Sequence, residues 1–510
     1  MPPSNPAQQH RAIITICTML ATLMQALDST IANVALPYMQ GSLASTPDQI
    51  TWVLTSYIVA AAIMTAPVGW LAARFGRKAL FMACLGGFTI ASMLCGAAQS
   101  LEQMVLFRLL QGMFGAGLVP LSQSTLLDLY PIEQRGTAMA LWGMGVMVGP
   151  ILGPTLGGYL TEVYNWRWVF YINLPFGILA IAGLMFFLED SREGTAATKF
   201  DWAGFGALSL GIGALQLMLD RGELKDWFGS VEIVTEATLA GLGFYLFLVH
   251  IVLAEKPFIP PRIFRDVNFS TSLAIMFTVG MVLLASSALL APYLQTLGGY
   301  PVEEAGLLMA PRGFGTMAAM LIAGRAVNRI DPRYIMLSGF ALIGISMQRM
   351  TGWTPDIGAQ SLAITTLIQG AGLGLVFTPL QVVAFATLPV ELRTNGTALF
   401  SLLRNVGSSI GISVTSFLLA QNTQIVHAGL ASFVTPFNRM LQTAGAYLYW
   451  NSATQGGLAA LNAEITRQAS IIAYMDDFKL MLLTCMAAAP LVFFIRRPLG
   501  AARQEVLPQE

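Results

Sequence analysis

Most of the sequence consists of apolar runs that are each long enough to cross a lipid bilayer, separated by short clusters of charged, Gly and Pro residues. A spanning helix needs about 20 mostly apolar residues. On that rule we predict fourteen spans, near 12–36, 50–72, 79–98, 104–128, 137–160, 169–188, 203–219, 233–254, 270–296, 304–324, 334–352, 361–387, 396–420 and 478–495. With 55% hydrophobic and 11% charged residues, the composition excludes an ordinary water-soluble domain.

The positively charged residues between the spans give the chain a direction in the membrane. Most of the 27 Lys and Arg residues lie on one set of short loops, and such loops stay on the cytoplasmic side. We therefore predict a multi-pass membrane protein with both termini in the cytoplasm. Residues 1–11 then form a cytoplasmic lead-in to the first span rather than a cleaved signal peptide.

Several other kinds of function have no support in the sequence. The formal net charge is zero and no basic run is long enough to follow a phosphate backbone, so we expect no nucleic-acid binding. The four cysteines lie in apolar runs without metal-ligand spacing, and the three histidines form no such pattern, so we expect no metal site and no cofactor. A G-x-x-x-x-G-K-[ST] motif is missing from the sequence, which argues against ATP hydrolysis.

An internal repeat divides the spans into two halves. The segment LYPIEQRGTAMALWGMGVMVGPILG, which begins at Leu129, recurs as TLPVELRTNGTALFSLLRNVGSSIG from Thr387, at an offset of 387 − 129 = 258 residues. Parallel halves of this kind are a transporter architecture with the binding site at their interface, near the bilayer midplane. We expect an N-terminal six-helix bundle over 1–190, two inserted linker helices over 191–266, and a C-terminal six-helix bundle over 267–510 with a partly helical extracytoplasmic cap at 421–477.

Among the charged side chains inside predicted spans we single out Asp28 in MQALDSTIANVALP and Arg108 in FRLLQGMFGAG. A charge in hydrocarbon is costly, and it survives only where it faces a protein interior or a wet cavity. Gln111 lies three residues after Arg108 and so on the same helix face. We assign Asp28 and Arg108 to proton coupling; a structural ion pair, or an arginine head that reaches the outer surface, is the alternative for Arg108.

A secondary antiporter needs a group that releases a proton when substrate binds. Burial of a carboxyl group in an apolar bundle favours its neutral form, so a cationic substrate and a proton would compete for Asp28. Other polar side chains in the spans are candidates for lining a substrate cavity, although for any one of them an interhelical hydrogen bond is the alternative. These candidates are Gln25, Asn33, Tyr57, Gln111, Gln123, Gln295, Gln369, Gln381, Arg404 and Asn405.

Two further segments have the composition of helix–helix contacts that open and close during transport. The loop GWLAARFGRKAL at 69–80 combines glycines with basic residues, and Asp128 at the end of a span is a candidate partner for its arginines, with a solvated helix end as the alternative. The run GMGVMVGPILGPTLGG at 143–158 has glycines at i, i+4 spacing, which favours close helix packing, and prolines that bend a helix. The candidate gating residues are Gly69, Arg74, Gly76, Arg77, Asp128, Gly149, Pro150, Gly153, Pro154 and Gly157.

Together these segments resemble the major facilitator superfamily, and within it the fourteen-helix drug:proton antiporters of the EmrB/QacA type. LDSTIANVALP at 27–37, the loop at 69–80, RLLQG at 108–112 and GPILGP at 149–154 are similar to that family's motifs D, A, B and C. NWRWVFYINLPFG at 165–177 and LQLMLDRGELKDWF at 215–228 are similar to the EmrB-like exporters of Gram-negative inner membranes. Where this family often has an acidic residue in the loop, the chain has Ala73, so the usual charge network there cannot be complete.

The resemblance implies an all-α membrane protein with the major facilitator fold, located in the cell inner membrane. It also implies a tripartite pump that includes a periplasmic membrane-fusion adaptor and an outer-membrane channel, and we place adaptor contact at the 421–477 cap. We predict proton-driven export of hydrophobic or amphipathic compounds. The alternatives are a dedicated exporter of one metabolite, such as an organic acid, siderophore or signal molecule, and, from other classes, a membrane sensor or a membrane-embedded enzyme, for which no nucleophile and base stand out.

Overall fold

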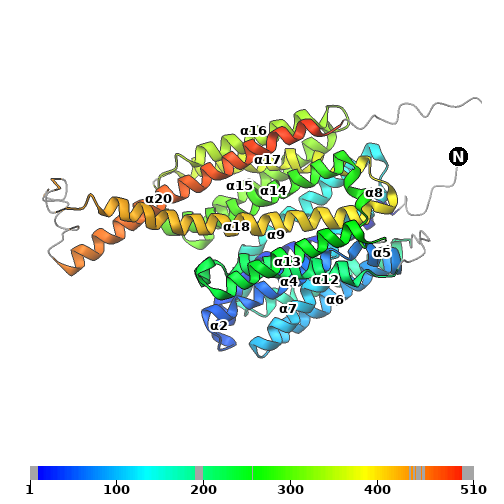
Figure 1. The fold of residues 1–510 in the computed structure, drawn as a ribbon, viewed down its shortest axis with the longest axis horizontal. Coiled ribbons are helices and arrows are strands. Elements are labelled where there is room, and N and C mark those ends of the chain that lie inside the picture. Colours follow the sequence, from blue (N-terminus) through cyan, green and yellow to red (C-terminus); the bar gives the residue numbers. More distant parts are fainter. Residues whose placement is uncertain are drawn as a thin grey trace, which may run out of the picture.

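The computed structural model describes residues 10–189, 199–255, 257–355, 357–435 and 454–496, with a few single positions between 438 and 450. All regular secondary structure in these ranges is helical. The helices lie roughly along one long axis, with the N-terminal half in the lower part of Figure 1 and the C-terminal half in the upper part. The all-helical fold predicted from the apolar runs is confirmed.

The N-terminal half is built from helices that match the first six predicted spans. Two of these spans are interrupted, since α4 and α5 are bent by 58° at Pro67, and α7 and α8 meet at a break before Gly117. The helices of this half are α2 (Arg11–Ser42), α3 (Pro47–Ile50), α4 (Trp52–Thr65), α5 (Val68–Phe75), α6 (Arg77–Ala97), α7 (Leu101–Gly115), α8 (Leu118–Leu129), α9 (Ile132–Val163), α10 (Trp168–Tyr171) and α11 (Asn173–Phe187).

Two further groups of helices follow the N-terminal half along the chain. The inserted helices are α12 (Trp202–Arg221) and α13 (Val231–Leu253), joined by the short turns η1 (Glu223–Lys225) and η2 (Trp227–Gly229). After η3 (Pro261–Arg265) come α14 (Val267–Pro292), the π-helical turn η4 (Tyr293–Leu297), α15 (Val302–Ala326), α16 (Pro332–Met350), α17 (Ala359–Ala386), η5 (Val390–Leu392), α18 (Arg393–Ala431), α20 (Gln455–Ala488) and η6 (Ala489–Phe494).

Within the described ranges, eleven helices are long and apolar enough to cross a membrane, or twelve when the bent pair α4 and α5 counts as one span. This establishes a multi-pass membrane protein. The inserted helices lie outside the two bundles, where α12 packs on α4 of one half and on α18 of the other. Ser413 on α18 donates to the carbonyl of Leu219 on α12 at 2.9 Å, which ties the inserted pair to the C-terminal half.

The glycines spaced by four along α9 let this helix pack closely on α2. A Cβ on Gly149 would lie 2.6 Å from the Cβ of Ala26, and one on Gly157 would lie 2.8 Å from Cγ1 of Ile31. Thr30 also donates to the carbonyl of Gly149 at 3.3 Å. The close packing predicted from the glycine spacing is therefore present, because only residues without a side chain permit this approach.

Two helices continue into the segment 421–477 that we predicted as a partly helical cap. We placed the ends of the flanking spans at 420 and 478, but α18 continues without a break to Ala431 and α20 already begins at Gln455. Both helices project past the remaining helices at the left of Figure 1, and His427 contacts Asn462 at 3.0 Å between them. The predicted spans 396–420 and 478–495 are therefore parts of longer helices, because polar residues next to a span are compatible with a helix that leaves the membrane.

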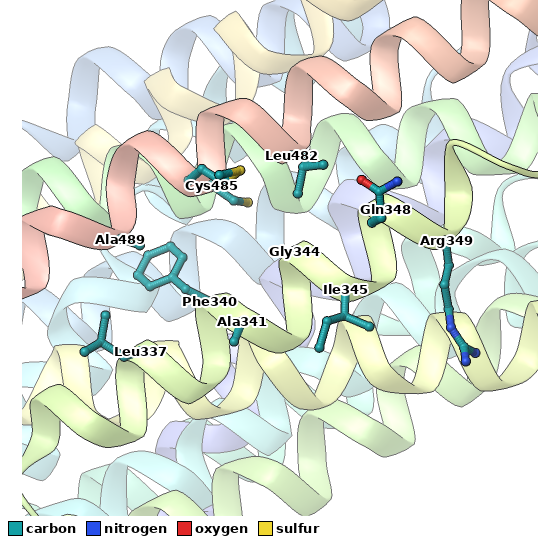
Figure 2. A pocket seen from close by; sticks show the side chains of 11 residues that line it. Leu337, Phe340, Ala341, Gly344, Ile345, Gln348, Arg349, Leu482, Cys485 and Ala489 are labelled. Atoms are coloured by element: carbon teal, nitrogen blue, oxygen red, sulfur yellow. The ribbon is translucent and has the colours of Figure 1, made fainter.

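A groove of ≈ 490 Å³ opens on the outer side of the C-terminal half, between α16 and α20 (Figure 2). Phe340, Ile345, Leu482 and Cys485 are among its mainly apolar lining residues, and Arg349 lies at one end. None of the predicted site residues lines this groove.

Candidate functional site

Asp28 lies in the middle of α2 with no exposed surface, and its carboxylate is fully surrounded by donors. Arg108 on α7 donates from Nη1 to Oδ2 at 2.6 Å. Gln111, one turn further along α7, donates from Nε2 to Oδ1 at 2.7 Å. Asn173 at the start of α11 lies 3.4 Å from the same Oδ1 atom. Three helices that are distant in sequence thus meet at this one carboxylate.

The Arg108 guanidinium also contacts a main-chain carbonyl, an amide oxygen and an aromatic ring. Its Nε donates to the carbonyl of Val53 on α4 at 3.0 Å, and its Nη1 donates to Oε1 of Gln111 at 2.8 Å. The guanidinium carbon lies 4.3 Å from the centre of the Tyr57 ring, a cation–π contact. With 1% of its side chain exposed, Arg108 does not reach the outer surface. Of the two alternatives given for Arg108, the structure therefore contains the ion pair and not the arginine head at the outer surface.

Polar side chains of α6 and α11 contact the residues that surround the Asp28–Arg108 ion pair. Asn173 donates to Oγ of Ser92 at 2.9 Å, and Ser92 donates to the carbonyl of Phe170 at 2.9 Å. The thiol of Cys95 lies 3.5 Å from Oε1 of Gln111. We did not predict Asn173, Ser92 or Cys95 as site residues. The only signal for them was a polar residue amid apolar neighbours, which is equally typical of an ordinary helix contact.

A buried ion pair of this kind is poor evidence for a purely structural role. The desolvation of two charges offsets most of their attraction, and apolar side chains of similar volume often give equal or greater stability. The Asp28 carboxylate nevertheless accepts from Arg108, Gln111 and Asn173, so it belongs to a polar network inside an apolar bundle, in which only Oδ1 of Asn173 lacks a partner among the described residues. Such networks in membrane proteins mark proton relays and ion pathways.

A polar stripe runs along α2 beside the buried carboxylate. Gln25, Ser29 and Asn33 follow one another at intervals of four residues, so they share one helix face. Gln25 is half-buried and lies 3.5 Å from the Tyr57 hydroxyl, whereas Ser29 and Asn33 are exposed. The same helix therefore presents Asp28 to the bundle interior and an open polar face on another side.

The remaining predicted substrate residues lie elsewhere, and in the described part of the chain no hydrogen bond joins them to Asp28. Gln123, Gln369 and Gln381 are buried, and no described residue forms a hydrogen bond with either amide atom of Gln369 or Gln381. Arg404 and Asn405 on α18 contact each other at 3.4 Å. Gln295 is exposed on η4. The structure thus gathers Asp28, Arg108, Gln111, Tyr57 and Gln25 at one site.

Asp128, at the end of α8, joins the two halves at the predicted cytoplasmic end. Its Oδ2 atom pairs with Arg77 of α6, one of the two partners that the sequence suggested. Its Oδ1 atom accepts from Nη1 of Arg393 on α18 at 2.6 Å, a contact that we did not predict. Arg74, the other suggested partner, is exposed, and among the described residues Asp128 forms no ion pair with it. Asp128 therefore binds one cation from each half.

Two glycine contacts close the same end. Gly69 on α5 lies directly against Asn395 on α18, and Gly324 on α15 lies so close to α9 that a Cβ would be 2.7 Å from the Gly136 carbonyl. Thr397 also donates to the Pro120 carbonyl across the halves at 3.0 Å. Gly76 has a φ of 87°, a conformation that favours glycine at the turn between α5 and α6. Pro150 and Pro154 belong to α9, but their side chains lie outside the described residues.

Comparison with known proteins places this geometry in a family. The model of the Major Facilitator Superfamily matches residues 18–412 and 268–495. The chain is 35% identical over 491 residues to the multidrug export protein EmrB of Escherichia coli (strain K12), covering 96% of each chain. It is also 35% identical over 489 residues to the fatty acid resistance protein FarB of Neisseria gonorrhoeae, again with 96% of each chain covered.

Two solved structures share the fold at low sequence identity. The human organic anion transporter MFSD10 (TETRAN) matches with a TM-score of 0.57 at 14% identity, over 95% of this chain and all of that one. A bacterial homologue of the human lysosomal transporter Spinster matches with a TM-score of 0.55 at 19% identity, over 97% and 99% of the two chains. At these identities the similarity concerns the arrangement of helices.

Proposed function

Since the chain belongs to the major facilitator superfamily and is similar to EmrB over nearly its whole length, we propose that it is a multidrug efflux transporter driven by protons. It is a transporter and not an enzyme. Its substrates are hydrophobic or amphipathic compounds, which it exports across the cell inner membrane. The observation that carries the proposal is the fully buried ion pair between Asp28 and Arg108.

Proton coupling follows from what protonation does to this pair. A proton on the Asp28 carboxylate removes the negative charge that compensates Arg108, and it turns one oxygen from an acceptor into a donor. The contact of 2.6 Å between Oδ2 and Nη1 then loses its attraction, and the guanidinium needs another acceptor. Proton binding therefore changes the contact between α2 and α7, and a shift of α2 moves the polar stripe of Gln25, Ser29 and Asn33, where we place substrate.

Alternating access requires that the two halves separate at one end while they close at the other. Three contacts hold the halves together at the end that we assign to the cytoplasm. They are the ion pairs of Asp128 with its two arginines, the contact of Gly69 with Asn395, and the contact of Gly324 with Gly136. Ser29 and Asn33 are exposed in this state. We assign the conformation to the outward-facing side of the cycle, in which substrate leaves and a proton enters.

The membrane arrangement completes the proposal. We assign fourteen spans, with α9 and α16 as spans in addition to those counted by length and hydropathy, and we place both termini in the cytoplasm. The projecting ends of α18 and α20 then lie in the periplasm. We propose that they contact a membrane-fusion adaptor, which connects the transporter to an outer-membrane channel. The charge bias of the short loops and the similarity to EmrB support this arrangement.

A second candidate function is the export of a single metabolite such as an organic acid. It is favoured by one observation: FarB, which is named for fatty acid resistance, is as similar to this chain as EmrB is. The two candidates share the proton site and differ in the breadth of compounds that the cavity accepts.

The experiment measures proton release inside lipid vesicles that contain the purified protein, on addition of a panel of hydrophobic weak acids and cations. We expect release with the wild type and loss of release with Asp28→Asn, while size-exclusion chromatography shows an intact fold. Asp226→Asn is the matched control, because Asp226 is exposed in a left-handed turn that Asn tolerates.

Undiminished release with Asp28→Asn would refute the coupling role of this carboxylate. A response of the wild type to one compound alone would decide for the single-metabolite exporter over the multidrug transporter.

A further inference from the structure

The repeat allows the surroundings of Asp28 to be matched to positions in the C-terminal half. Pro37-Tyr38 at the end of α2 recurs as Pro292-Tyr293 at the end of α14, at an offset of 292 − 37 = 255 residues. Gly69 and Gly324, which both close the same end of the molecule, have the same offset, since 324 − 69 = 255. Gln111-Gly112 on α7 recurs as Gln369-Gly370 on α17, at 369 − 111 = 258 residues.

One hydrogen bond in each half supports this matching of residues between the two halves. In the N-terminal half, Arg108 donates to the main-chain carbonyl of Val53. In the C-terminal half, Thr366 takes the place of Arg108, and its hydroxyl lies 3.5 Å from the carbonyl of Leu308, the counterpart of Val53. The two polar clusters therefore occupy equivalent places in their bundles.

The C-terminal cluster keeps a cation and an amide but has no carboxylate. Leu283 stands at the position of Asp28, and Thr366 at that of Arg108. The positive charge comes instead from Arg312, which stands where Tyr57 stacks on Arg108 in the other half. Gln369 occupies the position of Gln111, whose amide binds the Asp28 carboxylate.

The Arg312 side chain is buried, with 7% of the residue exposed, and its contacts are all with neutral groups. Nη1 donates to Oγ of Ser287 at 2.6 Å, and Nη2 donates to the Leu283 carbonyl at 2.8 Å and to Oγ of Ser286 at 3.0 Å. Among the described residues no carboxylate lies within ion-pair distance of it. Gln369 has no exposed surface, and within the described ranges neither of its amide atoms has a hydrogen-bond partner.

A buried guanidinium without a counter-charge is costly, and so is a buried amide without partners. One ligand removes both costs: an anionic group that accepts from Arg312 and from the Gln369 amide, as Asp28 accepts from Arg108 and Gln111. A carboxylate has the planar, two-oxygen geometry that a guanidinium binds in bidentate fashion. Ser287 is only half-buried, which leaves one edge of the cluster accessible.

We propose that Arg312, Ser286, Ser287 and Gln369 form a binding site for the carboxylate of an amphipathic anionic substrate. The site rests on the proposed transport function and names one substrate class for it. In this scheme the N-terminal half carries the proton on its own carboxylate, and the C-terminal half binds a carboxylate that the substrate brings. An acid and a cation of equal chain length should then depend on different residues.

The test measures the binding of decanoate and of decyltrimethylammonium to the purified protein in nanodiscs. We expect Arg312→Gln to weaken decanoate binding by about tenfold or more, the worth of a charge-assisted hydrogen bond, and to leave the cation within about twofold. Ser286→Asp places a carboxylate of the chain itself beside Nη2, so it should also abolish decanoate binding while the fold becomes more stable. Arg349→Gln, at the exposed groove in Figure 2, is the matched control.

Ser286→Asp keeps the proposal testable if Arg312→Gln fails to fold, because it compensates the buried charge. Equal losses for both ligands, or no loss for decanoate with a folded variant, would overturn the proposal. Displacement of decanoate by chloride at equal concentration would also overturn it, since the site would then select an inorganic anion. Binding is read without transport, so a wild type that binds decanoate but moves no protons contradicts the transport function and not this site.

Discussion

Arg393 of α18 donates to Asp128 of α8 at 2.6 Å, and this ion pair connects the two halves of the transporter. Asp128 also pairs with Arg77 of its own half. The aspartate thus separates two arginines that would otherwise repel each other, with Arg135 close enough to add to that repulsion. The predicted cytoplasmic end is closed by one carboxylate between cations.

Asp128→Asn should open this end, because the two arginines then face each other without a counter-charge. The measurement is the distance between spin labels at Gln134 and Arg329, two exposed positions on opposite halves. We expect a longer distance in the variant than in the wild type, and a smaller difference at high salt because salt screens partly exposed charges. The four native cysteines are buried, which limits labelling to the introduced sites. An unchanged distance distribution would show that the glycine contacts alone hold this end closed.

Gly324→Ala should also disfavour closure, because the added Cβ would lie 2.7 Å from the Gly136 carbonyl and 2.8 Å from the Cβ of Ala140. We expect reduced export and the same longer label distance. Gly86→Ala is the control, since a Cβ there meets nothing within 4 Å and alanine is the better helix former by about 1 kcal/mol. Equal effects of both substitutions would mean that helix propensity, and not the approach of α9 and α15, is being measured.

Arg108→Gln should destabilise the protein, because it leaves the Asp28 carboxylate buried without its cation. Removal of one partner from a buried pair costs about 3–5 kcal/mol in the free energy of unfolding. The double variant Arg108→Gln with Asp28→Asn should recover most of that loss, since no charge remains. The melting temperatures of the two single variants and the double variant in detergent test this. Strictly additive effects would contradict a direct interaction between the two side chains.

Replacement of the projecting segment between Gln424 and Thr466 by a short flexible linker should separate transport from cellular resistance. The ends of α18 and α20 within this segment project past the remaining helices, so we expect proton-coupled export in vesicles to continue. Drug resistance of cells should fall, because the proposed adaptor contact is lost. Vesicle transport and growth in the presence of drug are measured on the same variant. Full resistance without the segment would place the adaptor contact elsewhere.

Particular residues show how far the sequence could predict the site. Asp28 and Arg108 were recognisable because a charge in an apolar run is unusual whatever the fold. Their contact could not be predicted, since 80 residues separate them and nothing local determines which helices become neighbours. Arg393 was visible only as a loop charge that favours the cytoplasmic side, and its role in the contact with Asp128 depends on how the halves pack.

The ends of the helices show a similar limit. The glycine spacing in α9 predicts close packing because small residues permit it with any neighbour. The predicted span ends at 420 and 478 follow the loss of apolar character, whereas α18 and α20 continue beyond them because a helix extends as long as its own main-chain hydrogen bonds are satisfied.

The sequence by itself determined that the chain is helical and crosses a membrane, that it contains two repeated halves, and that it carries a carboxylate and an arginine inside its spans. These properties depend on hydrophobicity and periodicity, which act locally along the chain. Only the tertiary structure decided that Asp28 pairs with Arg108, that Asp128 connects the halves, and that no carboxylate in the described part of the chain pairs with Arg312. Charges are compensated through space, so their partners follow from helix packing and not from position in the sequence.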